Sequence, residues 1–382
     1  MTEIAPAPNA PAPQGFAAPA RFLGRALGFG VLMFLVCEAV FRTVVPARES
    51  PYPRQEPTLQ ILNYQPADHA EGVFTNGRFA TVRVPYHINS QGWNAGEPYL
   101  PAASRGKPVV AVLGDSQIEG FYVTWGENIT QRLAARGLGR FDGYAYGGSG
   151  FKMAQFLAIV RYLAREKIEP AVVVMATIQG DLSGSLENLG ARRGTQYTVR
   201  YDAATGKFED IAPKPYETTP LRRFMRESAL MRYLVFNARM DLLGGQGGPE
   251  PGLVGGVVTA EADPANAELF DRYVEHAIAE VAAQLPGSKL VFLMDANRMA
   301  LYRGDDPVRV VALSAILQRA CARHPETVLC VDLAEPFAQD WKATGERLQI
   351  EQNLHWNAKG HDLAAATLYD ALGARGWLPG GR

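Results

Sequence analysis

The sequence has little of several features that would class it at once. Only 3 of its 382 residues are cysteine, and no His/Cys cluster has the spacing of a zinc site. Its 38 Lys and Arg nearly balance its 39 Asp and Glu, so the broad basic field that attracts nucleic acid is absent. No internal repeat and no glycine-rich phosphate loop ending in Lys-Ser or Lys-Thr occurs. We therefore expect no metal, no cofactor and no nucleic-acid partner.

Long apolar runs are also scarce, and the one that stands out lies near the N-terminus. Residues 26–45 are apolar enough, and at about 20 residues long enough, to cross a bilayer as one helix. The ionisable residue inside this run is Glu38, one helical turn before Arg42, with which it could form an ion pair near the interface. This pattern predicts a transmembrane helix.

The residues before the run predict its orientation. Arg21 and Arg25 flank its start, which places the N-terminus in the cytoplasm and the C-terminal body in a bacterial periplasm, with the chain held in the inner membrane. Residues 1–25 are then a cytoplasmic tail, predicted to be disordered over the Ala-Pro-rich residues 1–20. A cleaved signal peptide is the alternative, but no convincing small-residue cleavage site follows the run.

The state of the cysteines depends on whether the compartment is oxidising. Cys37 lies in the apolar run, whereas Cys321 and Cys330 fall at a predicted helix end and in the strand after it. An oxidising periplasm would allow these two to form a disulfide. We expect two buried free thiols instead, the commoner outcome at such positions.

From residue 108 onward, apolar runs alternate with helical patterns, which predicts an α/β fold with a mainly parallel sheet of five strands. The predicted strands are 109–113, 144–147, 171–177, 289–295 and 328–331. The predicted helices are 128–136, 153–166, 265–284, 307–324 and 359–375.

Two segments depart from this alternation. Residues 46–107 are predicted to form a stalk and lead-in, with a short strand at 81–84, that acts as a lid or collar on the main domain of residues 108–382. Residues 183–263 are an insertion. Within it we expect a hairpin over 196–206, an Arg-bearing helical stretch over 221–243 and a mobile glycine-rich loop over 244–256, of the kind that shapes substrate pockets.

The candidate chemistry begins where the first strand of the main domain meets a tight turn. The strand from Val109 runs into Gly114-Asp115-Ser116, and a histidine follows the last predicted strand at His355. A buried parallel strand delivers its C-terminal end to the mouth of the sheet. A serine nucleophile there with a histidine base is typical of acyl transfer.

These residues also carry a family resemblance. The Gly114-Asp115-Ser116 turn, the glycines of residues 146–150, the Gln179-Gly180-Asp181 turn and the His355 segment resemble, in the same order, the four blocks of the SGNH/GDSL hydrolases. Residues 88–92 are similar to a segment that precedes the nucleophile in membrane-anchored bacterial members. The resemblance implies a three-layer α/β/α, flavodoxin-like domain behind the transmembrane helix.

Some of these candidate residues also have a structural role as an alternative. Ser116 could simply cap the following helix, and His361 could compete with His355 as base, although we favour packing for His361. The family usually has an aspartate two or three residues before the histidine, whereas this chain has Gln352 and Asn353. Asn353 could orient the imidazole but could not stabilise its charged form as a carboxylate does.

The resemblance also implies an oxyanion hole, formed by the backbone N–H groups of Ser116 and Gly147 and by an asparagine of the third block. Gly180 replaces that asparagine, so we expect Gln179 to supply the amide, with Asp181 beside it. Asp115 and Asp181 could instead bind Mg²⁺, an interpretation we do not favour. Four aromatic residues could stack on sugar rings or belong to the core: Tyr122, Trp125, Phe151 and Trp356.

Two functions remain open. The first is a membrane-anchored serine esterase or O-acyltransferase acting on acyl groups, most simply acetyl, of an envelope or exported glycan or of a small ester. The second is a non-catalytic domain of the same fold that binds a glycan or partner proteins in an envelope assembly. The altered residues at positions 353 and 180 motivate the second.

Overall fold

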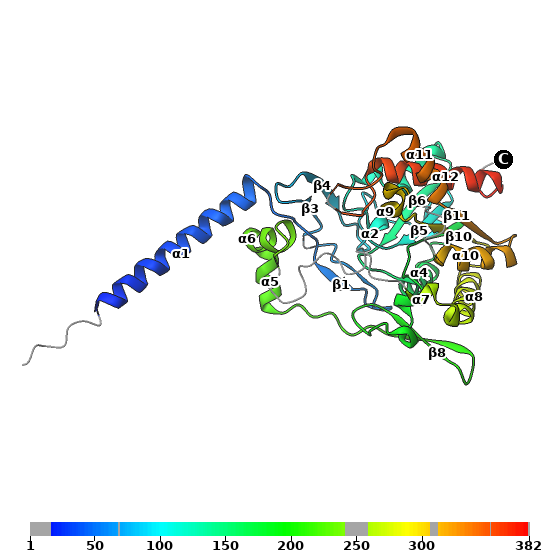
Figure 1. Cartoon of the computed structure of the whole chain (residues 1–382), viewed down its shortest axis with the longest axis horizontal. Coiled ribbons are helices and arrows are strands. Elements are labelled where there is room, and N and C mark those ends of the chain that lie inside the picture. The colour runs from blue at the N-terminus through cyan, green and yellow to red at the C-terminus, as the bar shows by residue number, and fades with distance from the viewer. Residues whose placement is uncertain (1–16, 68, 241–258, 306–311, 352, 381–382) are drawn as a thin grey trace, which may run out of the picture.

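The computed structural model describes residues 17–67, 69–240, 259–305, 312–351 and 353–380. A long N-terminal helix, α1 (Ala17–Thr43), extends away from an α/β body that holds the rest of the described chain (Figure 1). The C-terminus lies on the opposite side of that body.

The body is built around one sheet of five parallel strands, in the order β11-β10-β7-β5-β6. The strands are β5 (Val109–Gly114), β6 (Asp142–Gly147), β7 (Val172–Thr177), β10 (Lys289–Met294) and β11 (Val328–Asp332). All five coincide with predicted strands to within a few residues. The order is that of flavodoxin-like sheets, so the predicted fold class is confirmed.

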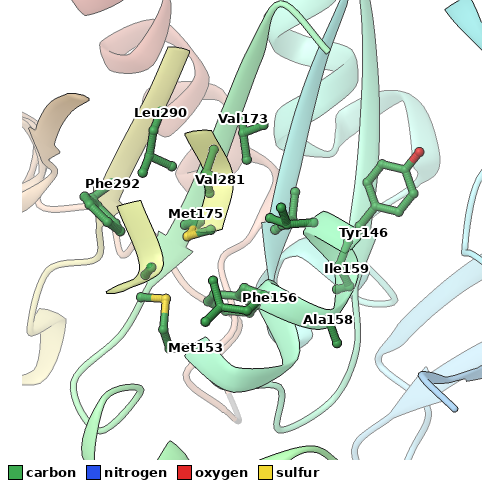
Figure 2. Packing of buried hydrophobic residues seen from close by; sticks show 14 of the residues in the cluster. Tyr146, Met153, Phe156, Ala158, Ile159, Val173, Met175, Val281, Leu290 and Phe292 are labelled. Atoms are coloured by element: carbon green, nitrogen blue, oxygen red, sulfur yellow. The ribbon is translucent and has the colours of Figure 1, made fainter. Parts of the chain in front are cut away.

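Side chains of each strand alternate between two apolar cores, as strand geometry requires. On β5, Val109 and Ala111 enter one core, while Val110 and Val112 enter the other. Figure 2 shows the first core, where residues of β7 and β10 meet residues of α4. Because both faces are covered, the central strands are apolar throughout.

Helices cover both faces of the sheet (Figure 1). One face carries α4 (Met153–Arg165), α8 (Ala267–Gln284) and α10 (Ala312–Arg323). The other carries α3 (Ile129–Arg136), α9 (Arg298–Arg303), α11 (Ala334–Thr344) and α12 (Ala358–Ala374). The short helices α9 and α11 were not predicted. The others match predictions, although residues 307–311 of the fourth predicted helix lie outside the described residues.

The lead-in segment is packed into the body. It forms two antiparallel pairs, β1 (Pro53–Gln55) with β2 (Leu62–Tyr64) and β3 (Glu71–Asn76) with β4 (Val82–His87). Its side chains Ile61, Trp93 and Tyr99 belong to the same apolar core as β5 and β7. The lead-in, called the collar below, therefore shares its core with the sheet.

The insertion contains the predicted hairpin and helical stretch. Strands β8 (Thr198–Asp202) and β9 (Lys207–Ile211) form the hairpin. The helical part is divided into α5 (Pro220–Glu227), α6 (Ala229–Arg232) and a π-helical turn (Tyr233–Asn237), followed later by α7 (Thr259–Ala262). Ser228 separates α5 from α6 by capping the second helix, its Oγ accepting from Met231 N at 3.3 Å. The predicted glycine-rich loop over 244–256 lies outside the described residues.

Helix α1 starts at Ala17, nine residues before the predicted start of the apolar run. Its segment Phe22–Thr43 is long and apolar enough to cross a membrane. The Glu38–Arg42 ion pair forms as predicted, with an N–O distance of 2.7 Å. By length and composition α1 fits either an anchor or a signal sequence near the N-terminus.

The expectation of free thiols at Cys321 and Cys330 is wrong, because the two residues form a disulfide. A tight turn at the end of α10, in which Val328 N donates to His324 O at 2.9 Å, reverses the chain into β11. This reversal brings the two Cα atoms to 5.9 Å, within the range a disulfide bridges. The turn, which the cysteine spacing does not reveal, decides the outcome.

The disulfide gives the first prediction. Replacing both Cys321 and Cys330 with serine should lower the free energy of unfolding by about 2–3 kcal/mol, because the unfolded chain regains the freedom of a nine-residue loop. Denaturant unfolding of the full chain in detergent would measure the loss. Cys37→Ser, which removes the free thiol, is the control and should leave the unfolding curve unchanged. Equal stability of the oxidised native chain and the double variant would contradict the prediction.

Candidate active site

The candidate residues gather where the strand order of the sheet reverses. From β5 the chain crosses to β6 on one side, and it then returns to β7 on the other side of β5. The carboxyl ends of β5 and β7 therefore flank the crevice in which α/β sheets bind ligands. Ser116 follows β5 directly, and the Gln179-Gly180-Asp181 turn follows β7.

Ser116 is the first residue of α2 (Ser116–Glu119). It is not the helix cap, because Asp115 fills that role: its carboxylate accepts a hydrogen bond from Gln117 N at 2.9 Å. The capping alternative for Ser116 is thereby removed. Its hydroxyl is left to meet a partner at the N-terminal end of the helix.

That partner is His355, whose Nε2 lies 2.7 Å from Ser116 Oγ. On the other side of the ring, Nδ1 lies 3.1 Å from Asn353 Oδ1, which also accepts from His355 N at 2.9 Å. Because a backbone N–H can only donate, the amide atom facing it must be the oxygen. Nδ1 therefore carries the proton, and Nε2 is free to accept the Ser116 hydroxyl hydrogen.

Gln117 holds the histidine loop from both sides, which the sequence did not predict. Its Oε1 accepts from Trp356 N at 2.8 Å, and its Nε2 donates to Leu354 O at 3.1 Å. These two backbone groups flank His355. Gln117 therefore positions the loop that carries the imidazole.

A buried ion pair, Arg298 with Asp295, holds the same loop. Arg298 donates to both oxygens of Asp295, at 2.5 and 2.6 Å, and also to Leu354 O. Asp295 in turn accepts from Trp356 Nε1 at 3.1 Å. Leu354 and Trp356, on either side of His355, are thus tied to the end of β10, so the loop cannot shift without breaking several buried hydrogen bonds.

The surroundings of His355 favour its neutral form. Tyr122 stacks on the imidazole with a centroid separation of 4.0 Å, and only 3% of the residue is exposed. Burial, followed by the positive charges of Arg48 and Arg298, lowers the pKa of His355 to about 3. A neutral imidazole with a free Nε2 is the form that a general base requires.

Gly147, the last residue of β6, lies beside α2. A Cβ there would come within 2.0 Å of Glu119 N and 2.4 Å of Ile118 C, both backbone atoms of α2. Any larger residue would therefore displace the helix that carries Ser116. The structural requirement for glycine is clear, and the oxyanion role of the Gly147 N–H stays a prediction.

The Gln179-Gly180-Asp181 turn has a partner that the sequence did not reveal. Glu261 of the insertion accepts from Gln179 Nε2 at 2.6 Å and from Gly180 N at 2.8 Å, as well as from two N–H groups of the next turn. Gln179 Oε1 accepts from Leu313 N at 3.3 Å. The Gln179 amide is thus engaged at both ends in supporting the turn, and its role as an oxyanion donor stays a prediction.

Asp181 is fully buried and stabilises the same turn. Its carboxylate accepts from Ile178 N at 2.8 Å and lies 3.2 Å from Lys152 Nζ. Burial raises the pKa of Asp181 to about 6 and that of Asp115 to about 7, the latter also through repulsion from Asp181. Within the described ranges, no group of three or more His, Cys, Asp or Glu side chains is placed to hold a metal ion.

The remaining candidates have packing roles. His361 is buried in α12 and contacts the edge of Trp356, as favoured from the sequence. Trp356 and Phe151 are core residues, each 1% exposed, and Trp125 packs against the core. Of the four aromatic candidates, it is Tyr122 that stacks on His355.

Comparison with known proteins adds a limited result. No protein-family model matches the chain, and no curated protein matches it. Solved structures similar to it include a lipolytic G-D-S-L family protein from Veillonella parvula, 10% identical over 69% of this chain and 98% of that one, with a TM-score of 0.38. The peptidoglycan O-acetyltransferase A catalytic domain of Streptococcus pneumoniae is 11% identical over 71% and 95% of the two chains, with a TM-score of 0.34.

A third similar structure is described as a putative acylhydrolase from Bacteroides fragilis. It is 15% identical over 71% of this chain and 92% of that one, with a TM-score of 0.35. At such low identities and TM-scores, the likeness carries no argument about function. The sheet order of this chain and its Ser116–His355–Asn353 geometry carry that argument instead.

The Gln117 contacts give the second prediction. Gln117→Leu should slow covalent labelling of Ser116 by a fluorophosphonate roughly tenfold, the effect of about 1.4 kcal/mol in the activation free energy, because His355 loses two flanking restraints. Labelling rates of the detergent-solubilised full chain would measure this.

The matched control is Gln131→Leu, which removes one hydrogen bond from a part-buried glutamine of α3 to Gly143 O. Each substitution should lower the free energy of unfolding by about 1–3 kcal/mol. Only the Gln117 variant should lose labelling rate at a temperature where both are folded. Equal labelling by the two variants would show that Gln117 has a structural role alone.

Proposed function

We propose that this protein is a membrane-anchored serine esterase or O-acyltransferase. The observation that carries the proposal is the 2.7 Å contact of Ser116 Oγ with the unprotonated Nε2 of His355. A serine hydroxyl is a weak nucleophile unless a neighbouring base removes its proton. This pair provides the base, and Asn353 provides the third group that fixes its tautomer.

In the proposed reaction, Ser116 Oγ attacks the ester carbonyl while its proton passes to His355 Nε2. The N–H groups of Ser116 and Gly147 would stabilise the oxyanion. The imidazolium then donates its proton to the leaving alcohol, which leaves an acyl-serine. Water, in an esterase, or a second hydroxyl, in a transferase, attacks this acyl-serine as His355 takes its proton. The bond between the acyl carbon and Ser116 Oγ then breaks, and His355 returns the proton to Ser116 Oγ as the acyl product leaves.

The burial of Ser116 supports a short acyl group such as acetyl. Ser116 is 6% exposed, and the ring of Tyr122 covers the imidazole beside it. A long acyl chain would need an apolar channel to the serine, whereas acetyl is among the smallest acyl groups and needs the least space.

Two features support action outside the cytoplasm, on an envelope or exported glycan. The Cys321–Cys330 disulfide is of a kind that persists in oxidising compartments. Helix α1 would anchor the domain at the membrane from which such polymers emerge, and so offset weak binding by a high local concentration. A small ester would be accepted by the same chemistry.

The decisive experiment compares variants of the full chain on aryl acetates and with a fluorophosphonate probe. Ser116→Ala and His355→Ala should each lower turnover by at least about a thousandfold, because each removes a member of the unit that forms the acyl-enzyme. Ser104→Ala and His87→Asn, at exposed sites on the collar side of the body, are the controls and should retain full activity.

The second candidate function, a non-catalytic glycan- or partner-binding domain, is favoured by the near-complete burial of Ser116 and His355. It predicts no labelling of Ser116 by the probe and no difference between native chain and Ser116→Ala. Labelling that is lost only in the Ser116 variant excludes it.

The pH dependence gives a further prediction. The base must be neutral, and the pKa of His355 is lowered to about 3, so His355 itself should cause no loss of kcat/KM as the solution is acidified from pH 8 to about pH 5. An ordinary imidazole would already lose activity through its pKa of about 6.5. Asp115 and Asp181, whose pKa values are raised to about 7 and about 6, titrate in the same range, so Asp115→Asn and Asp181→Asn are measured alongside. A loss centred near pH 6.5 that neither variant removes would contradict the burial argument.

Asn353→Asp is the matching variant. A carboxylate beside Nδ1 favours the imidazolium, so the acid limb should move to higher pH while turnover at neutral pH rises about tenfold or more. Asn357→Asp, at the cap of α12 away from Ser116, is the control and should change neither. An unchanged limb in Asn353→Asp would show that Asn353 does not act through the ring.

A further inference from the structure

Helix α5 of the insertion exposes apolar and basic side chains that the candidate active site does not use. Leu221 is 57% exposed and Phe224 is 51% exposed, and at a spacing of three they share one face of the helix. Arg222 and Arg223 between them are also exposed and lie on the rest of the helix, whereas Arg226 is half-buried and donates to Pro51 O at 3.3 Å. An amphipathic basic helix of this kind is typical of the membrane–water interface.

Hydrogen bonds fix the position of α5 along the axis of α1. The Glu38 carboxylate accepts from Ser228 Oγ at 2.8 Å, from Ala229 N at 2.8 Å and from Leu230 N at 3.0 Å. Glu38 therefore caps α6, directly after α5. It lies five residues before Thr43, which at 1.5 Å per residue is about 7.5 Å inside the apolar segment.

Two further contacts hold the end of α5 at the same level. Arg42 Nη2 donates to Glu227 O, the last residue of α5, at 3.0 Å. Phe41 stacks on Tyr233 with a centroid separation of 3.8 Å. Figure 1 shows α5 and α6 beside the C-terminal end of α1, apart from the sheet.

We propose that α5 lies in the headgroup layer of the membrane that α1 spans, with Leu221 and Phe224 toward the acyl chains and the arginines on lipid phosphates. The inference rests on the membrane anchoring proposed above. Continuity with the apolar segment sets the depth, since the end of α5 contacts residues of that segment. Charge complementarity sets the lipid, because arginines beside an anionic surface are attracted to its headgroups.

This placement also fixes the catalytic body. Asn237, at the end of the π-helical turn, accepts from Arg48 N at 2.9 Å and donates to Thr75 Oγ1 at 3.0 Å and to Gly77 O at 3.1 Å. The insertion is thus bonded to the exit of α1 and to the β3–β4 pair at once. The active site is held at one distance from the bilayer instead of moving on a flexible tether.

The test places a nitroxide spin label at Phe224→Cys in the full chain with Cys37→Ala, reconstituted into nanodiscs. Collision with oxygen, which concentrates in lipid, and with a water-soluble nickel chelate reports where the label lies. Two reference positions are labelled in the same way: Leu32→Cys, exposed on α1 within the apolar segment, and Leu138→Cys, 86% exposed on the body.

High oxygen and low nickel collision at position 224, as at position 32, is the expected result. High nickel collision, as at position 138, would overturn the proposal because the helix would be in water. Low collision with both reagents would also overturn it, because another protein surface or a second copy would cover the helix. If α1 is not an anchor, position 32 itself will show nickel collision, so failure of the anchoring proposal is seen separately.

A second comparison tests the arginines. Nickel collision at position 224 should fall at least about twofold when anionic phosphatidylglycerol replaces part of a phosphatidylcholine bilayer. Arg222→Gln with Arg223→Gln should abolish this dependence, while Arg319→Gln, on α10, should leave it intact. Lipid dependence that survives the double substitution would overturn the assignment of phosphate contacts to these arginines.

Discussion

The candidate site depends on one contact between residues 239 positions apart, the hydrogen bond of Ser116 with His355. Neither residue can reach the other locally. Ser116 is positioned by β5 and α2, and His355 by a loop after the last strand of the sheet. The contact therefore exists only when all five strands are in order and the loop is held in place. The polar groups around the contact serve mainly to hold the loop that carries His355.

The side chains that hold His355 and its loop are amides, whereas a carboxylate is the usual partner of a histidine base. Asn353 sets the tautomer of His355, and Gln117 binds the backbone on both sides of it. The nearest carboxylate in the support, Asp295, is neutralised by Arg298. The candidate site thus stabilises a neutral imidazole, and these supporting groups offer no unpaired carboxylate that would stabilise a charged one.

The sheet and both partners of the dyad could be predicted from the sequence because they leave local signals. Continuous apolar strands alternate with amphipathic helices, and a serine follows one of these strands at a glycine turn. Other features leave no such signal. Glu261 lies 82 residues from Gln179, and neither residue marks the other. The disulfide depends on a turn, and nothing near Gln117 in the sequence marks the two backbone groups beside His355 that it binds.

Because collar residues form part of the core of the body, the protein cannot be divided between the two. The composition places a boundary near residue 107, yet Ile61, Trp93 and Tyr99 fill the core behind β5, and Tyr99 Oη accepts from Ala145 N at 2.9 Å within β6. A fragment starting at residue 108 would carry an open cavity and an unpaired strand amide. The smallest autonomous unit therefore begins close to the end of α1, and a chain divided at the compositional boundary would have a defective fold.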